Sequence, residues 1–193
     1  MKTVGIIAEY NPFHNGHQYH LNESKALTES EGVVCVMSSS FLQRGEPGLL
    51  DKWERTKMAL AGGADLVIEL PMPYAVRSAE FFAYGAVSLL DATGVVDSIS
   101  FGSEAGELDN LNEIASILAS EPGEFDHLIG KYLGQGLSYP QARTKALKDY
   151  IDRDNNDFSI DGQEVMELTS NPNNILGIEY LKAIHRLDSD LKP

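Results

Sequence analysis

Short apolar runs alternate with longer amphipathic stretches over the first half of the chain. The runs are rich in β-branched residues and have no polar alternation, which is typical of parallel strands covered on both faces. They lie at 4–8, 32–37, 66–70 and 98–101. Helices are expected between them, at 16–30, 51–61 and 78–92. Asp51 is a suitable N-cap for the second helix, and Gly62-Gly63 is a suitable end for it.

Repeated strand–helix units with right-handed crossovers form a parallel sheet with helices on both faces. We therefore predict a Rossmann-like α/β core over residues 1–104. After residue 104 only helical patterns remain, and a polar, acidic loop is expected at 152–157. The helices are predicted at 108–120, 125–133, 138–151, 162–168 and 173–187. Residues 105–170 are expected to form a helical insertion or cap, and residues 171–193 to return to the core.

The end of the sequence is expected to follow the same alternation. Residues 188–193 leave the last helix where another strand would come next. We therefore expect about four strands, with a fifth missing from this chain.

Length and composition limit the number of domains and the cellular location that we expect. A chain of 193 residues is long enough for one domain with its own core. Its single cysteine, Cys35, lies in an apolar run, which favours a reducing, cytoplasmic location. No apolar stretch approaches the length of a membrane span, and the first residues do not have the layout of a signal peptide. Secretion and membrane insertion are therefore not expected.

Net charge argues against independent binding to nucleic acids. The chain carries 29 acidic and 15 basic residues, a net charge of −14. Because Lys and Arg supply most of the affinity for phosphate backbones, we expect any RNA binding by this chain alone to be weak and sensitive to salt.

The segment with the clearest chemistry is the run IAEYNPFHNGH at residues 7–17. It joins the first predicted strand to the first helix, where ligands bind in open α/β sheets. Pro12 is expected to fix the turn, and Gly16 to let a ligand approach the backbone. His14 and His17 are three residues apart and are expected to share a helix face. Two imidazoles at a helix N-terminus suit a phosphate group.

These histidines have two other interpretations. A single histidine near a helix start is most often a surface or capping residue. His20 continues the spacing of His14 and His17, so the three could form a zinc site. Because no cysteine lies nearby and the helix dipole opposes a cation, phosphate binding is favoured and no metal site is predicted.

Longer matches point to a family. The H-x-G-H spacing resembles the nucleotidyltransferase superfamily, and residues 5–17 resemble the bacterial tRNA(Met) cytidine acetate ligase family. Further matching segments are FLQRGEP at 41–47, GGADLVIELP at 62–71, SFGSE at 100–104, SYPQAR at 138–143 and PNNILG at 172–177. The chain departs from the family at Ser39-Ser40, where a Gly-Asn pair is usual. Family members also continue beyond this length, with a fifth strand and a second phosphate loop.

The resemblance implies an ATP site. Its expected residues are Ile7, Ala8, Glu9, Tyr10, Asn11, Pro12, Phe13, His14, Asn15, Gly16, His17, Gln18, Tyr19, His20, Gly102 and Asn173. His14 and His17 are the expected catalytic pair. At Gly102 the missing side chain would admit adenine or ribose, and the Asn173 amide would read the adenine or cap its helix. Arg44 is expected either to contact pyrophosphate or RNA, or to be a solvated loop residue.

The resemblance also implies an activity. Acetate and ATP, with Mg²⁺ on the phosphates, would form acetyl-adenylate, and the acetyl group would pass to N4 of the wobble cytidine in elongator tRNA(Met). Two alternatives stay open: another adenylyltransferase of the superfamily, and a non-catalytic nucleotide-binding fragment. The first would accept a different acid or phosphate, whereas the second would bind ATP without turnover.

Overall fold

A computed structural model describes residues 1–153 and 158–193, so residues 154–157 of the predicted acidic loop lie outside the described residues. The chain divides into two compact units. One contains Met1–Gly102 and Leu187–Pro193, and the other contains Ser103–Arg186. Each unit has its own secondary structure and its own buried side chains, and we describe them separately.

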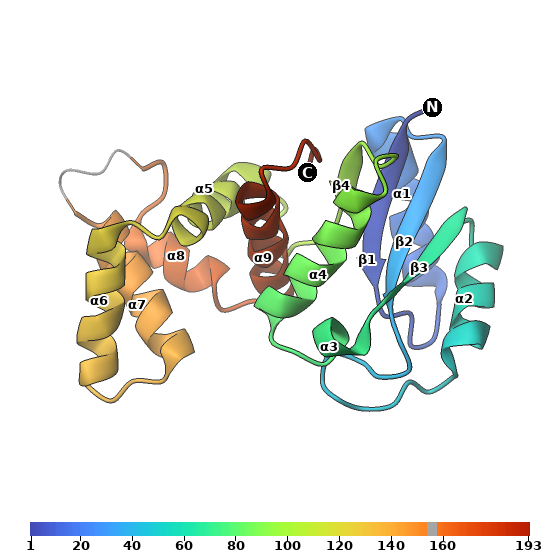
Figure 1. Cartoon of the computed structure of the whole chain (residues 1–193). Helices are drawn as coiled ribbons and strands as arrows, with labels where there is room; N and C mark the ends of the chain where they lie inside the picture. Colours follow the sequence, from blue (N-terminus) through green and yellow to red (C-terminus); the bar gives the residue numbers. More distant parts are fainter. Residues whose placement is uncertain (154–157) are drawn as a thin grey trace. The chain divides into compact units, whose positions relative to one another are not determined.

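The first unit is built on a four-stranded parallel sheet (Figure 1). Its strands are β1 (Thr3–Ala8), β2 (Gly32–Ser38), β3 (Leu66–Leu70) and β4 (Ser98–Ser100), in the order β3-β2-β1-β4. In the register, Ile6 lies beside Cys35 on β2 and Ser100 on β4. All seven residues of β2 are buried. The predicted α/β sheet is therefore confirmed, and its carboxyl ends form one edge.

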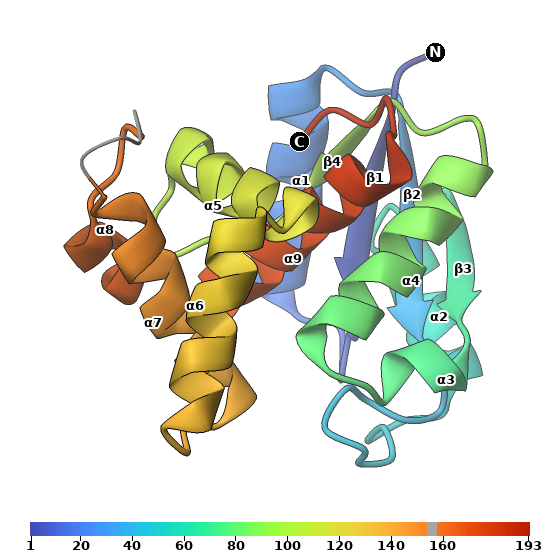
Figure 2. The same ribbon diagram turned by 60° about the vertical axis from the view of Figure 1, so that its left-hand side comes forward.

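Helices cover the two faces of this sheet (Figures 1 and 2). The first unit contains α1 (Asn15–Thr28), α2 (Lys52–Ala61) and α4 (Ala79–Ala92). Leu21 of α1 and Ala59 of α2 pack in one cluster with Ile6. On the opposite face α4 comes so close that a Cβ at Gly5 would lie 2.8 Å from Leu90 Cδ1. One short helix, α3 (Met72–Ala75), was not predicted from the sequence.

The C-terminal residues of the first unit run along the free edge of β4. The Ile99 amide donates to the Lys192 carbonyl at 2.8 Å, and the Lys192 amide donates to the Asp97 carbonyl at 3.1 Å. Lys192 thus makes a parallel bridge to Ser98. Lys192 therefore pairs with the edge strand at the point where the strand–helix alternation would place a further strand, and the sheet itself has the four strands expected.

Helices joined by loops, with no strand among its described residues, form the second unit. It contains α5 (Leu108–Ser120), α6 (Gly123–Gly134), α7 (Tyr139–Ile151), α8 (Gly162–Leu168) and α9 (Pro172–Leu187), whose last residue falls in the first unit. The core of this unit includes Leu111, Ile114, Phe125, Leu147 and Val165, each at most 1% exposed. Among the helices that the structure describes, none is both long and apolar enough to cross a membrane.

Candidate functional site

Aromatic side chains fix the connection between β1 and α1. Tyr10 has a φ of 46°, a left-handed conformation that is uncommon for a bulky residue, and it is 2% exposed. Its ring meets Phe13 and His17 edge-on, with centroids 4.9 Å away in each case. Its hydroxyl lies 3.5 Å from Cys35 Sγ, and burial raises the pKa of this thiol to about 11. The start of α1 is therefore anchored in the core of the first unit.

The two expected catalytic histidines cap α1. His14 is the N-cap, and its Nδ1 accepts a hydrogen bond from the Gly16 amide at 3.0 Å. His17 Nδ1 accepts one from the His14 amide at 3.2 Å. The two rings are stacked, with centroids 3.7 Å apart. The two rings therefore lie side by side at the start of α1, with His14 at the N-cap position just before the first helical residue, and they meet through the capping arrangement.

These contacts determine which ring nitrogen carries the proton. Because each Nδ1 accepts a backbone N–H, the neutral ring must carry its hydrogen on Nε2. Burial, followed by the nearby His14 and His20, lowers the pKa of His17 to about 4, so His17 is neutral at pH 7. No residue described in the structure accepts a hydrogen bond from Nε2 of His14 or His17. The start of α1 therefore carries two N–H donors available for a ligand.

A contact with His14 explains why position 16 is a glycine, and this contact was not predicted from the sequence. A Cβ at this position would lie 3.0 Å from His14 Cε1 and 3.1 Å from His14 Nδ1. The glycine therefore makes room for the imidazole that caps the helix.

His20 lies one turn beyond His17 on α1. Its Nε2 is buried without a hydrogen-bond partner, and burial lowers its pKa. Across residues 1–153 and 158–193, no three His, Cys, Asp or Glu side chains form a group able to hold a metal ion.

Arg55 is a site component that the sequence analysis missed. Its side chain is 0% exposed although it is charged, and burial lowers its pKa. The guanidinium donates to the Glu9 carbonyl at 2.6 Å, to the Leu50 carbonyl at 3.2 Å and to the Ser39 carbonyl. It therefore connects the ends of β1 and β2 to the end of the loop at 39–50. The sequence signal was slight: Arg55 is spaced i, i+4 from Ala59 on the buried face of α2.

Two further hydrogen bonds tie the 39–50 loop to the run that follows β1. The Glu9 carboxylate accepts the Gln43 amide at 2.7 Å, and Asn11 Oδ1 accepts the Leu49 amide at 2.6 Å. The loop is consequently held against two of the expected ATP-binding residues.

Arg44 lies at the tip of this loop. The Gly45 amide donates to the Leu42 carbonyl at 2.8 Å and closes a tight turn, in which Gly45 has a φ of 80°. Arg44 itself is exposed. Ser39, which replaces a usual family residue, donates through Oγ to Glu69 at 2.6 Å. Ser39 is therefore held by Glu69, and the Arg44 side chain is exposed to solvent.

The other two expected ATP-binding residues lie in different units. Gly102 follows β4 at the carboxyl edge of the sheet, and a Cβ there would meet nothing within 4 Å. Asn173 lies in the first turn of α9, in the second unit. No internal contact explains why position 102 is a glycine.

The start of α9 is capped by Glu104 and not by Asn173. The Glu104 carboxylate accepts the amide of Asn173 at 3.2 Å, the Asn173 Nδ2 at 3.0 Å and the amide of Asn174 at 2.8 Å. Desolvation opposes ionisation of Glu104, but these hydrogen bonds outweigh it and lower its pKa. The capping interpretation of Asn173 is therefore wrong, and its amide is oriented by Glu104.

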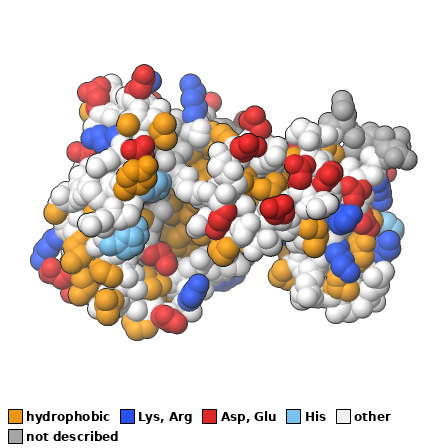
Figure 3. Space-filling model, turned by 180° about the vertical axis from the view of Figure 1, so that it is seen from behind, with side chains coloured by type: hydrophobic (Ala, Val, Ile, Leu, Met, Phe, Trp, Pro, Cys, Tyr) orange, Lys and Arg blue, Asp and Glu red, His pale blue; other side chains and the backbone are white. Residues whose placement is uncertain are grey.

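Charged side chains of both signs are spread over the face seen in Figure 3, with histidines also reaching the surface. The 7–20 run follows β1 and the 39–50 loop that carries Arg44 follows β2, and the hydrogen bonds from the Gln43 and Leu49 amides join the two segments. Arg55 and Glu104 were not predicted, because their contacts join segments that are distant in the sequence.

Comparisons with known proteins match this arrangement over the whole chain. A family model described as HIGH Nucleotidyl Transferase matches residues 1–193. Proteins named tRNA(Met) cytidine acetate ligase are 54% identical in Halothermothrix orenii and 53% identical in Acetivibrio thermocellus. Each alignment covers 100% of this chain, but 46% and 45% of those proteins.

A solved structure also matches the whole chain. The crystal structure of Thermotoga maritima TmcAL bound with alpha-thio ATP has a TM-score of 0.94 and 41% identity, covering 100% of this chain and 45% of that one. The present chain thus spans about half the length of the proteins it matches. With the whole of its 193 residues matched by the family model, the chain belongs to the HIGH nucleotidyl transferase family.

Proposed function

We propose that this chain is the nucleotide-activating part of an ATP-dependent acetate ligase that acetylates N4 of the wobble cytidine in elongator tRNA(Met). One observation carries the proposal: two imidazoles at the N-terminus of α1 accept backbone amides through Nδ1 and keep their Nε2–H donors available. The names of relatives at 53–54% identity support the choice of acid and acceptor.

In the first step acetate attacks the α-phosphorus of ATP, and the bond to the β,γ-pyrophosphate breaks. Negative charge builds on the nonbridging oxygens as phosphorus becomes five-coordinate. His14 and His17 donate to these oxygens through Nε2, at the positive end of the α1 dipole. The products are acetyl-adenylate and pyrophosphate.

In the second step the cytidine N4 amine attacks the acetyl carbon, AMP leaves and the nitrogen loses a proton. Activation is needed because the lone pair of this amine is delocalised into the ring. We assign ATP contacts to residues 7–20, Gly102 and Asn173. The open space at Gly102 supports this, because a nucleotide against the backbone there explains the missing side chain. Arg44, exposed at its loop tip, would contact pyrophosphate or RNA.

The remaining partners follow from this chemistry. Mg²⁺ would arrive as the counter-ion of the ATP phosphates, since magnesium commonly binds through substrate phosphates. Acetate is the acid and tRNA the acceptor, and the cytoplasm, where both are available, is the expected location. With a net charge of −14, this chain alone would hold tRNA weakly.

The test is acetate-dependent exchange of pyrophosphate into ATP by this chain, with a panel of other acids and phosphates as competing substrates. We expect exchange with acetate. Exchange with another acid but never with acetate would identify a different adenylyltransferase. ATP binding measured by calorimetry without any exchange would instead identify a non-catalytic nucleotide-binding module.

A further inference from the structure

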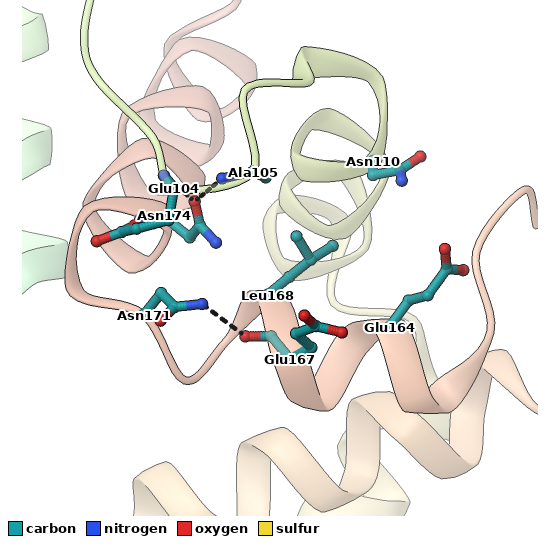
Figure 4. Close-up of a pocket in the computed structure, with 8 residues that line it drawn as sticks. All are labelled: Glu104, Ala105, Asn110, Glu164, Glu167, Leu168, Asn171 and Asn174. Atoms are coloured by element: carbon teal, nitrogen blue, oxygen red, sulfur yellow. Dashed lines mark hydrogen bonds between the residues drawn. The ribbon is translucent and has the colours of Figure 1, made fainter.

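A cavity in the second unit has a chemistry that the proposed ATP site does not use. It has a volume of about 150 Å³ and lies between the loop after β4, α5, α8 and the start of α9 (Figure 4). Its eight lining residues include Glu104, Glu164, Glu167, Asn110, Asn171 and Asn174, but no Lys or Arg. A carboxylate or phosphate ligand would therefore meet only like charge in it.

Asn174 supplies a hydrogen-bond donor to this cavity. The residue is 1% exposed, and its Oδ1 accepts the amides of Glu104 at 2.9 Å and Ala105 at 3.1 Å. These two bonds orient the amide, so that its nitrogen points into the space between Asn171 and Leu168 (Figure 4). Within the described residues Nδ2 has no hydrogen-bond partner. The nitrogen therefore faces the cavity as a donor that an acceptor on a ligand, or water, can use.

Carboxylates supply the complementary acceptors. The Glu104 carboxylate is engaged by the start of α9, and Glu164 Oε2 accepts the Asp161 amide at 3.0 Å. The Glu167 carboxylate takes no hydrogen bond from the described residues and lies on the same side of the cavity as Leu168 (Figure 4). Leu168 is 9% exposed and adds an apolar surface on which a flat ring can rest.

The geometry points to a site for the amino edge of a nucleobase, in which an exocyclic amine lies next to a ring acceptor. The amine would donate to Glu167, and the ring nitrogen or carbonyl would accept from Asn174. Carboxylates accept from the N4 amine of cytosine, and asparagine amides pair with amino-bearing bases. This inference deepens the proposed function, on which it rests for the identity of the base. Cytosine from the RNA acceptor and adenine from ATP share this edge.

The experiment titrates the whole chain with cytidine, uridine and adenosine, followed by ligand-observed NMR and by the side-chain amide signals of Asn174. We expect cytidine to shift these signals and to bind about 10- to 100-fold more tightly than uridine, which presents a carbonyl in place of the amine. Adenosine binding that displaces cytidine would support the amino-edge site and assign it to ATP. Equal binding of cytidine and uridine would overturn the proposal.

Isosteric variants test the two contacts. Asn174→Asp keeps the acceptor for Glu104 and Ala105 but removes the donor, and Glu167→Gln removes the negative charge. We expect each to weaken cytidine binding about 10-fold or more. The matched controls are Asn112→Asp and Glu124→Gln, which lie outside the cavity and should leave binding unchanged. If neither cavity variant weakens binding, the proposal is wrong. Because no step uses ATP turnover, failure here is distinct from failure of acetate-dependent exchange.

Discussion

The starts of α1 and α9 have opposite caps. At α1 the backbone amides of His14 and Gly16 are taken by imidazole nitrogens, which bring no charge when neutral. At α9 the amides of Asn173 and Asn174 are taken by the ionised Glu104 carboxylate. Both helices satisfy their first amides, as helix ends must.

The difference lies in the electrostatic potential that remains. A helix N-terminus carries roughly half a positive charge, which neutral caps preserve and a carboxylate cancels. The α1 end is therefore suited to an anion such as a phosphate, and the α9 end is not. At the α9 end the Glu104 carboxylate orients Asn173, and Glu104 also lines the cavity that contains Asn174. Hydrogen-bond satisfaction alone would not distinguish the two ends.

The largest expected effect is on catalysis at α1. His14→Ala and His17→Ala should each lower adenylate formation by about 10²–10³-fold, or roughly 3–4 kcal/mol, because the lost donors act on charge that develops in the transition state. The double variant should lose less than the sum. His20→Ala should lose less than either single variant, because it lies a turn further from the helix start. Steady-state adenylate formation in a full-length relative with this segment is the measurement.

A cap-preserving variant separates this role from folding. His14→Asn keeps an acceptor for the Gly16 amide and removes the Nε2 donor, so it should lose activity while Tm stays unchanged. Near-parental activity of His14→Ala, or loss of activity only through unfolding, would contradict the assigned role.

A smaller effect is expected at Gly102. Gly102→Ala adds a methyl group that meets nothing within 4 Å in the structure, so Tm should stay the same. ATP binding should weaken about tenfold, equivalent to about 1.4 kcal/mol, because the methyl group would meet the nucleotide. Gly130→Ala is a matched control, since its Cβ is equally free of contacts. Unchanged ATP affinity by calorimetry would remove Gly102 from the site.

At the α9 end a change of stability is expected. Glu104→Ala removes the carboxylate that accepts three hydrogen bonds, and thermal unfolding should show Tm lower by about 1–4 °C. Glu104→Gln, which keeps an acceptor, should recover part of that loss. A Tm equal to that of the parent in both variants would show that the cap does not stabilise the helix.

A modest pH effect should come from His17. Its folded-state pKa of about 4 lies below the ordinary value of 6.5, so the unfolded chain binds the proton more readily. The contribution to stability is complete above about pH 6.5 and is lost as pH falls towards 4. Urea unfolding between pH 4.5 and 7 should therefore show a stability that rises with pH, with a shallower slope in His17→Gln. Equal slopes for the two proteins would contradict the shifted pKa.

The smallest signal is expected for RNA. With a net charge of −14, this chain should bind tRNA weakly, and the binding should decline steeply as salt is raised. Filter binding at several salt concentrations measures this. Tight binding at physiological salt would mean that a basic surface exists on the folded chain.

Sequence reasoning succeeded where a single segment determines its own structure. The covered strands were found because uninterrupted β-branched runs have few alternatives. Asp51 caps α2 through hydrogen bonds to the amides of Trp53 and Glu54, as its position before an amphipathic stretch indicated. The H-x-G-H segment was expected between the first strand and the first helix, and it lies there because both flanking elements were predicted from their own patterns.

Contacts between distant segments were not predictable in this way. Burial of Arg55 depends on carbonyls that three other parts of the chain bring together. The Glu104 contact with Asn173 spans 69 residues. Even within H-x-G-H, the spacing indicated a shared face, whereas the ring nitrogens turned back to cap the backbone. The spacing of residues cannot predict this capping, because it depends on the side-chain rotamers of the two histidines.

The most direct test of the two caps is a histidine ¹⁵N NMR spectrum of the chain with and without ATP. We predict that His14 and His17 accept the backbone amides through Nδ1 and carry the proton on Nε2, and that ATP shifts these two Nε2 signals while those of His127 and His185 stay in place. A proton on Nδ1 of either residue, or Nε2 signals that do not respond to saturating ATP, would contradict the account.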